Sequence, residues 1–532
     1  MKNRFKILLC CIIPFFTGFE TQSQSLQILW QQCYGGSGDD LGYSVIPSSA
    51  GYFLFGGTTS NNGDVHGNHG NIDFWLVSID STGNILNSSC FGGSDIDGPV
   101  WMNHCLDGGY ILTGATWSNN GNVTNNHGGA DYWLVRTDEN GNIVWKKCFG
   151  GSCNDELWGL SMTSDSGYLC CGVSCSNDGD VTGNHGSNDY WVAKVDKNGN
   201  LKWEKSLGGS SPDWGGYAAE TNDGGAIVGG WTGSTDEDVN CQHHGNLDAW
   251  MVKLDSSHNI EWQKCYGGSA DDVIDQIIPL DDGTYLFRGF TLSSDGDITD
   301  QHGNGDFWVG KTDPYGNLLW NHCYGGGDRD EPFFMKQVSD GGYILGGYTL
   351  SNDGEVSGNH SLSGYSDMWF IKISPDGTLI WEQCFGGEMD EILNDAVELP
   401  GHKFLLFGGS SSDNWGDVNC FHHGVGTDDF WLVMVYDSTT GGINDKSSDF
   451  DDLTVYPNPA SDFVKFAFKG KHHISEERIQ IINEMGEIIK ELILPPMTNE
   501  ITWDTSKTPA GVYCYFYYVG DIRKTGKIVI IK

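Results

Sequence analysis

Positive charge is scarce in this chain of 532 residues, which has 29 lysines and arginines against 71 aspartates and glutamates and a formal net charge of −42. The last 82 residues are nearly balanced, so the excess of negative charge lies between residues 25 and 450. A field of this sign repels nucleic acid and anionic membrane surfaces. We therefore expect no nucleic-acid partner, and either a solvated secreted surface or one that holds cations.

Helical periodicity and common catalytic motifs are also missing. No segment repeats apolar residues at a 3.6-residue spacing, which excludes a helical solenoid. No nucleophile elbow, phosphate loop or metalloprotease helix is present. The one long apolar run is Ile7 to Phe16, which follows the basic residues Lys2, Arg4 and Lys6. This arrangement is typical of a secretory signal peptide, here residues 1–24, because the run is too short to span a bilayer.

A unit of about 58 residues recurs seven times between Trp30 and Asp437. Each copy has an Asp-x-Trp tripeptide and a glycine pair, which follows an aromatic residue in six copies and Leu207 in the fourth. The tripeptides begin at Asp73, Asp131, Asp189, Asp248, Asp306, Asp367 and Asp429. A repeat of this length indicates one supersecondary unit that stacks on its neighbours.

Each unit is expected to form four short strands, which in the third copy are residues 157–163, 168–174, 190–196 and 200–206. Seven such units predict an all-β, seven-bladed β-propeller over residues 25–440, followed by a linker at 441–450. The seventh unit lacks its last strand, and Leu26–Tyr34 supplies the missing sequence. We expect this N-terminal strand to close the last blade, which removes a bare sheet edge. The repeat resembles the tryptophan-rich propeller repeats of secreted Bacteroidota proteins.

Residues 451–532 have a different composition, with β-branched strands in place of the glycine-rich repeat. The segment opens with Tyr456-Pro457-Asn458-Pro459, contains Gly511 and Tyr513, and ends in an apolar run bounded by Lys527 and Lys532. It resembles the type A C-terminal sorting domain of the Bacteroidota type IX secretion system. The resemblance implies a small immunoglobulin-like β-sandwich, handling by the type IX secretion machinery and a secreted or outer-surface location. It also implies attachment to the outer-membrane surface as an option once the sorting domain is removed.

Six repeats carry a cysteine at the same position. Equivalent positions in different blades are too far apart to bond, so we interpret these cysteines as small buried apolar residues. The cysteines at this position are Cys33, Cys90, Cys148, Cys265, Cys323 and Cys384. The third repeat has additional cysteines, and we predict a disulfide between Cys153 and Cys175, which are expected at the same end of one blade.

The long loop of each unit joins its second and third strands, and it contains an acidic or amide residue followed by a histidine. One interpretation is a calcium site, with Asp64, Asp178, Asp180 and Asp297 as candidate ligands, because calcium prefers oxygen donors. The other is structural, with Asp and Asn forming turns while the histidine bonds the aspartate before the tryptophan. Seven-fold recurrence favours the structural interpretation.

Two tryptophans recur in the repeat, that of Asp-x-Trp and that of a Trp-x-x-Cys pattern (Ser206 replaces the cysteine once), and we expect both sets to be core residues. Within the repeats, six tryptophans lie outside these sets: Trp101, Trp117, Trp158, Trp214, Trp231 and Trp415. Exposed aromatic rings on a polar face suit sugar rings or a protein partner. We name Trp117, Trp214, Trp231 and Trp415 as candidate ligand-binding residues, with packing under irregular loops as the alternative.

These observations favour a secreted binding or adhesion propeller for a glycan or protein over an enzyme. The alternative is an extracellular hydrolase or lyase with its site at the mouth of the channel. A sialidase needs three clustered arginines, but the repeats have only Arg136, Arg288 and Arg329, and Arg136 occupies a scaffold position. The adjacent pair Cys170-Cys171 is reminiscent of quinoprotein dehydrogenases, although it is expected to lie within a strand.

Overall fold

The computed structural model describes residues 26–361, 364–420, 426–437, 453–456, 460–468, 477–483, 488–494, 500–519 and 522–531. The chain divides into two compact units, Met1–Asp437 and Ser438–Lys532. The described residues form strands and turns but no helix, so no helix among them could cross a membrane. The predicted signal peptide lies outside the described residues.

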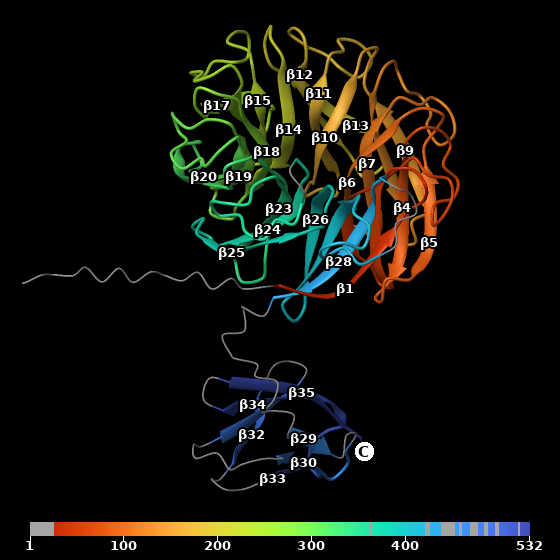
Figure 1. Cartoon of the computed structure of the whole chain (residues 1–532), viewed down its shortest axis with the longest axis vertical. Helices are drawn as coiled ribbons and strands as arrows, with labels where there is room; N and C mark the ends of the chain where they lie inside the picture. The colour runs from red at the N-terminus through yellow and green to blue at the C-terminus, as the bar shows by residue number, and fades with distance from the viewer. Residues whose placement is uncertain are drawn as a thin grey trace, which may run out of the picture. The chain divides into compact units, whose positions relative to one another are not determined.

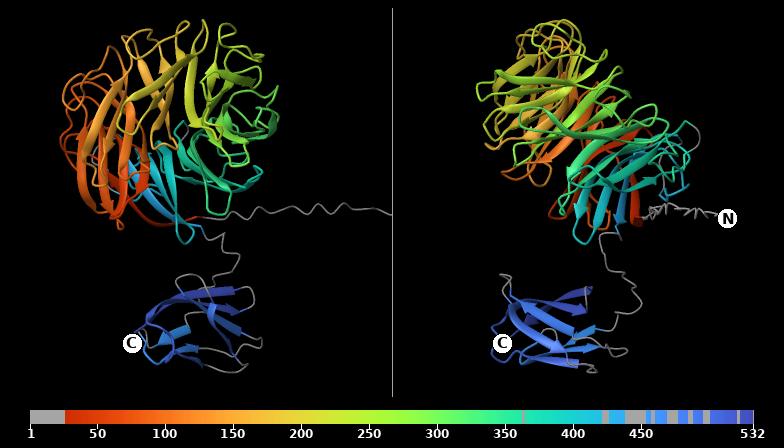
Figure 2. Two further views of the ribbon diagram at one scale, coloured as in Figure 1. Left: turned by 180° about the vertical axis from the view of Figure 1, so that it is seen from behind. Right: turned by 90° about the vertical axis from the view of Figure 1, so that its left-hand side faces the viewer.

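The first unit contains seven four-stranded antiparallel sheets, which succeed one another around a common centre (Figures 1 and 2). We number them blades 1 to 7 in chain order. The strands of blades 1 to 4 are β2 (Asp40–Pro47), β3 (Gly51–Thr58), β4 (Asp73–Asp80), β5 (Ile85–Phe91), β6 (Asp97–His104), β7 (Tyr110–Thr116), β8 (Asp131–Thr137), β9 (Ile143–Phe149), β10 (Asp155–Met162), β11 (Tyr168–Ser174), β12 (Asp189–Val195), β13 (Leu201–Leu207), β14 (Asp213–Glu220), β15 (Ala226–Thr232), β16 (Asp248–Leu254) and β17 (Ile260–Tyr266). Those of blades 5 to 7 are β18 (Asp272–Pro279), β19 (Tyr285–Thr291), β20 (Asp306–Thr312), β21 (Leu318–Tyr324), β22 (Asp330–Gln337), β23 (Tyr343–Thr349), β24 (Asp367–Ile373), β25 (Leu379–Phe385), β26 (Glu391–Leu399), β27 (Lys403–Ser410), β28 (Asp429–Tyr436) and β1 (Gln27–Tyr34). The predicted strands of the third copy agree with β10 to β13 within two residues.

Blade 7 draws its strands from both ends of the unit, in the order β1-β28-β27-β26. Gln27 faces Tyr436 and Tyr34 faces Phe430 across the β1–β28 ladder. The two strands lie side by side in Figure 1, β1 in red and β28 in blue. β2 of blade 1 packs on β26 and β27, so the first and last blades are neighbours. The N-terminal strand therefore pairs with the seventh unit as the sequence indicates.

The tryptophans of the Asp-x-Trp tripeptides form the centre of each blade. All seven are fully buried: Trp75, Trp133, Trp191, Trp250, Trp308, Trp369 and Trp431. The strands that carry them are buried along almost their whole length because both faces of a blade pack on neighbouring blades. The second set lies on the outer strands, where the indole Nε1 of Trp145 donates to the carbonyl of Lys197 at 3.0 Å in the next blade. Both sets thus belong to the scaffold, as predicted.

The crossing between blades is fixed by a buried carboxyl group at the first residue of every innermost strand. In blade 4, Asp213 accepts hydrogen bonds from the Gly209 amide and the Ser234 hydroxyl, both at 2.7 Å, and from the Thr232 hydroxyl. A Cβ on Gly208 would lie 2.7 Å from Asp213 Oδ2 and 2.8 Å from Asp189 Oδ1, so only glycine fits there. The equivalent carboxyl groups are fully buried in all seven blades: Asp40, Asp97, Asp155, Asp213, Asp272, Asp330 and Glu391.

The disulfides correct part of the cysteine interpretation. Cys153 and Cys175 are bonded, as predicted, with Cα atoms 5.5 Å apart. Cys33 and Cys265, however, are not free small residues, because each bonds a cysteine in the long loop of its own blade. The pairs are Cys33–Cys420 and Cys241–Cys265, with Cα separations of 5.6 and 5.5 Å. Cys90, Cys148, Cys323 and Cys384 are free, and the last three are buried.

The two disulfides that the sequence did not predict form because two of the long loops contain a cysteine of their own. Blades 4 and 7 alone have the sequence Asn-Cys-x-His-His in their long loops, at Asn240–His244 and Asn419–His423. A loop cysteine can reach the outer strand of the same blade, whereas equivalent cysteines of different blades cannot meet.

The second unit has two antiparallel sheets, β29-β30-β33 and β32-β31-β34-β35. Their strands are β29 (Leu453–Tyr456), β30 (Phe463–Phe468), β31 (Glu477–Ile482), β32 (Ile488–Leu494), β33 (Glu500–Asp504), β34 (Gly511–Val519) and β35 (Ile522–Ile530). Phe466, Trp503 and Tyr515 from the two sheets share one core, which makes the unit a β-sandwich.

The predicted sorting-signal residues fall partly within this sandwich. Tyr456 ends β29 and is exposed, Gly511 begins β34, and Tyr513 is buried and donates a hydrogen bond to the carbonyl of Pro509 at 3.0 Å. Pro457, Asn458, Pro459, Lys532 and the side chain of Lys527 lie outside the described residues.

Candidate functional site

A cavity of about 720 Å³ opens at one mouth of the propeller channel. Every blade contributes to its lining from the first half of its innermost strand, namely β2, β6, β10, β14, β18, β22 and β26. These strand ends lie next to the crossings between blades and the long loops, because the innermost strand begins where the crossing ends. The cavity is therefore on the long-loop face of the propeller.

Blades 2 to 4 line one side of the cavity with five tryptophans: Trp101, Trp117, Trp158, Trp214 and Trp231. Trp214 and Trp231 face each other across the β14–β15 ladder, with ring centroids 5.8 Å apart and an interplanar angle of 24°. Trp158 lies 5.9 Å from Trp214, centroid to centroid, and is 45% exposed. We call these five residues the tryptophan wall.

Blades 5 and 6 line the cavity with charged groups. The guanidinium of Arg288 is buried and donates to the carbonyl of Pro332 at 2.8 Å and to that of Phe333 at 2.5 Å. Its Nη1 is 3.3 Å from Oδ2 of Asp275. Glu331 is held by Arg329, whose Nε and Nη2 lie 2.9 and 2.7 Å from Oε2. Because each carboxylate has an arginine partner, this wall offers hydrogen bonds without a large net charge.

Blades 1 and 7 complete the lining with Leu41, Tyr43, Ile392 and Asn394. The amide of Asn394 donates to the carbonyl of Gly42 at 2.8 Å and is thereby fixed. The cavity thus combines one aromatic wall, one polar wall and an apolar edge, an arrangement typical of a small-ligand site.

Three of the four tryptophans named from the sequence, Trp117, Trp214 and Trp231, line this cavity. Trp415 does not, and its side chain is 54% exposed in the long loop of blade 7. Trp101 and Trp158, which the sequence also marks as outside the repeat, belong to the wall. The charged residues Asp275, Arg288 and Glu331 were not proposed as ligand contacts. For Asp275 and Glu331 the signal is their position, because the second and fourth residues of each innermost strand line the cavity and differ from blade to blade. Arg288 lies on β19 and has no such signal.

The candidate calcium ligands lie at the crossings between blades and accept hydrogen bonds from backbone amides. Oδ2 of Asp64 is 3.3 Å from the Gly35 amide, and Oδ2 of Asp297 is 3.2 Å from the Gly267 amide. Asp180 makes the same contact with Gly150 at 3.4 Å, and Asp178 accepts from the Ser152 amide at 2.7 Å. These contacts tie the long loops to the crossings and are not the local turns that the structural interpretation expects of these residues.

The loop histidines make the hydrogen bond to the aspartate before the tryptophan that the structural interpretation requires. Five pairs have Nδ1–Oδ2 distances of 2.6 to 2.9 Å, and the sixth, His244–Asp248, is at 3.4 Å. His423 lies outside the described residues. This part of the loop prediction is confirmed for five blades; in the sixth, the ring of His244 is at ion-pair distance and its backbone amide donates to Asp248 Oδ2 at 2.6 Å.

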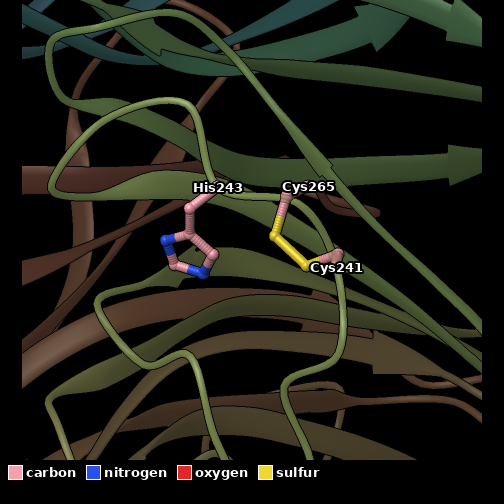
Figure 3. A group of neighbouring side chains, drawn as sticks. All are labelled: Cys241, His243 and Cys265. Atoms are coloured by element: carbon pink, nitrogen blue, oxygen red, sulfur yellow. A yellow bond between two sulfur atoms is a disulfide. The ribbon is translucent and has the colours of Figure 1, made fainter.

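Within the part of the chain that the structure describes, one group of side chains has the spacing of a metal site: Cys241, His243 and Cys265. Its two sulfur atoms are joined as a disulfide beside the histidine ring (Figure 3). A disulfide removes both thiolates, which are the ligands that zinc would use. The group is therefore a covalent link between the long loop and the outer strand of blade 4.

Of the comparisons by sequence, the one with protein families gives a match, and this match lies in the C-terminal unit. Residues 454–532 match the family described as "Secretion system C-terminal sorting domain". This domain indicates export by the type IX secretion system to the cell surface or the extracellular space. No curated protein matches the chain.

Solved structures with a similar arrangement of strands are distant in sequence. A BBS1N–ARL6DN complex soaked with lead is 7% identical, with 79% of this chain and 98% of that chain covered and a TM-score of 0.39. A puromycin hydrolase is 10% identical over 82% of this chain and 58% of its own, with a TM-score of 0.40. A DUF4221 protein from Bacteroides vulgatus is 8% identical over 77% and 98%, with a TM-score of 0.31. At this level the comparisons carry no information about ligands or reactions.

Proposed function

We propose that this exported propeller is a glycan-binding protein whose ligand enters the channel mouth and stacks on the tryptophan wall. The observation that supports it most strongly is the convergence of five non-repeat tryptophans from three blades on one cavity. Sugar rings present a flat C–H face that packs on indole and hydroxyl groups that need hydrogen-bond partners. The opposite wall supplies such partners through Asp275, Arg288, Glu331 and Asn394.

The rigidity of the site supports recognition. Trp158, Trp214 and Trp231 stand on or at the ends of paired strands, so little conformational entropy is lost when a ligand orders them. The long loops of seven blades surround the mouth and provide room for a chain that extends out of the cavity. Retention on the outer surface after export belongs to the same proposal, because a surface-held lectin would attach the cell to glycans.

A glycan array probed with residues 25–532, the chain without its predicted signal peptide, tests this function. We expect binding to a restricted set of glycans, lost when Trp214 and Trp231 are both changed to alanine and kept when the exposed Trp415 is changed to alanine. If the double variant binds as well as the parent chain, the cavity is not the glycan-binding site. Thermal melting of each variant separates loss of binding from loss of fold.

A hydrolase or lyase is the second candidate, because Glu156, Asp275 and Glu331 bring three carboxylates to one cavity. General acid–base chemistry needs a carboxyl group that is free to exchange a proton with the substrate. Asp275 and Glu331 are engaged by arginines, which favours binding over catalysis. Incubation of each bound glycan with the protein, followed by mass spectrometry of the products, distinguishes the two: we expect the glycan intact.

A further inference from the structure

Glu156 differs from the other two carboxylates of the cavity because it has no positive partner within the described part of the chain. No lysine, arginine or histidine among the described residues forms an ion pair with it. The hydrogen bond that its carboxyl group accepts is a long one, 3.5 Å from the side-chain amide of Asn154 to Oε1. Asp275 and Glu331 are each within ion-pair distance of an arginine. The cavity therefore contains one uncompensated negative charge.

This charge lines the same cavity as the aromatic rings. Glu156 and Trp158 are two residues apart on β10, where the strand bulges between Leu157 and Gly159, and both line the cavity. Trp158 is 5.9 Å from Trp214, centroid to centroid. The face of an indole ring attracts a cation, and tryptophan does so more strongly than other aromatic residues. A carboxylate next to such rings forms a site for an ammonium group.

The half-buried state of Glu156 supports the same assignment. Burial raises the pKa of its carboxyl group, so the charged form is partly desolvated with no protein group to compensate it. A ligand cation would supply that compensation. The negative field of the chain, with a net charge of −42, also concentrates cations and disfavours glycans that carry carboxylate or sulfate groups.

We propose, on the basis of the glycan-binding function above, that the ligand is an amino-sugar glycan whose protonated amine pairs with Glu156 and lies against Trp158 and Trp214. The sugar ring that carries the amine stacks on the tryptophan wall. Its hydroxyl groups face Asp275, Arg288 and Asn394 across the cavity. A neutral, N-acetylated sugar would keep the stacking but lose the ion pair and the cation–π contact.

Calorimetric titration of residues 25–532 tests this assignment with two oligosaccharides of equal length, one of glucosamine and one of N-acetylglucosamine. The measurements are made at mildly acidic pH, where the free amine is protonated. We expect the glucosamine oligomer to bind at least about tenfold more tightly. We expect Glu156→Gln to reduce this ratio to near one. Added salt should also reduce the ratio, because it screens the ion pair.

The matched control is Glu139→Gln, which removes one exposed carboxylate from a tight turn of blade 2 and should leave the ratio unchanged. Trp214→Ala should weaken both oligomers. If both oligomers bind with equal affinity, or if Glu156→Gln keeps the ratio, the amine assignment is overturned while glycan binding stands. If neither oligomer nor any arrayed glycan binds, the proposed function fails with it. Melting curves of all variants show whether each is folded.

Discussion

Asp213 and Trp214 are adjacent on β14, yet they belong to two different regions of the molecule. Asp213 is fully buried at the crossing between blades 3 and 4, where hydroxyl and amide groups hold its carboxyl group. Trp214 points into the channel mouth and stacks on Trp231. The first position is acidic in all seven blades, whereas the second position varies: Leu41, Gly98, Glu156, Trp214, Val273, Glu331 and Ile392.

The difference shows how the repeat separates folding from recognition within two residues. A constant position faces an environment that is the same in each blade, so one side chain satisfies all seven. The next position faces the cavity, where seven strands meet and each blade can contribute a different chemistry. We therefore expect changes at constant positions to lower stability, and changes at variable positions to alter binding.

The largest loss of stability is expected where the scaffold closes on itself. Cys33 and Cys420 are 387 residues apart in sequence, whereas Cys153 and Cys175 are 22 apart. By the loop-closure entropy of the unfolded chain, removing the first link costs roughly 6 kcal/mol and removing the second roughly 3 kcal/mol. Urea unfolding of the two double Cys→Ser variants measures the difference. A smaller effect for Cys33→Ser/Cys420→Ser would mean that the link contributes little to closure.

The adjacent pair on β14 gives the most direct test of the comparison. Asp213→Ala leaves three buried donors without their acceptor, and we expect it to lower the free energy of unfolding by about 3 kcal/mol. The folded fraction of this variant should bind glycan as the parent does. Trp214→Ala should instead reduce affinity by about tenfold, with a smaller loss of stability. Denaturant unfolding and calorimetry on both variants decide the matter, and a reversed pattern would contradict the division.

The pH dependence of stability tests the constant positions, because their carboxyl groups are buried. Burial raises the pKa of Asp97, Asp131 and Asp330 to about 6 and that of Glu391 to about 7. Their unfolded values are about 4, so the folded chain binds more protons between about pH 4 and pH 7. The melting temperature should therefore fall as pH rises through this window.

At lower pH the direction reverses. Hydrogen bonds from Asn142 hold the pKa of the exposed Asp138 below its usual range, and such groups lose their contribution as they take up protons. Maximum stability is thus expected near the lower end of the window. Glu391→Gln removes the group with the highest of these pKa values and should flatten the upper part of the curve. A melting temperature that rises steadily from pH 4 to 7 would contradict the burial argument.

The smallest effect is expected from removal of divalent cations. Asp64, Asp180 and Asp297 accept backbone hydrogen bonds at the crossings, so chelation with EDTA should leave the melting temperature unchanged. A fall that calcium chloride reverses would restore the calcium interpretation of the long loops.

Much of the fold could be predicted because the same local interactions recur in all seven copies of the repeat. The four-strand unit, the buried Asp-x-Trp tryptophans and the His–Asp hydrogen bonds all depend on residues close in sequence. The seventh unit lacks one strand and the N-terminal segment has the sequence of that strand, so the sequence also indicated that the two pair. The Cys153–Cys175 disulfide followed because both residues were expected at one end of one blade, and it is confirmed.

The candidate site was predicted less completely because its parts come from different blades. The sequence marked six tryptophans as outside the repeat, but it did not show that five meet while Trp415 stands apart. It placed Arg136 at a scaffold position but did not show where Arg288 and Arg329 lie. The structure separates them, since Arg288 lies at the cavity while Arg136 is near the tight turn that contains Asp107.

The sequence by itself determined the unit, its number of copies, the C-terminal sorting domain and the buried residues that each blade needs, because these depend on spacing along the chain. Tertiary structure alone decided which variable residues share the channel mouth, which carboxylates have a positive partner and which loop cysteines reach an outer strand. The reason is geometric: seven innermost strands, separated by hundreds of residues, begin at one small opening, and only the arrangement of the blades brings their side chains within contact.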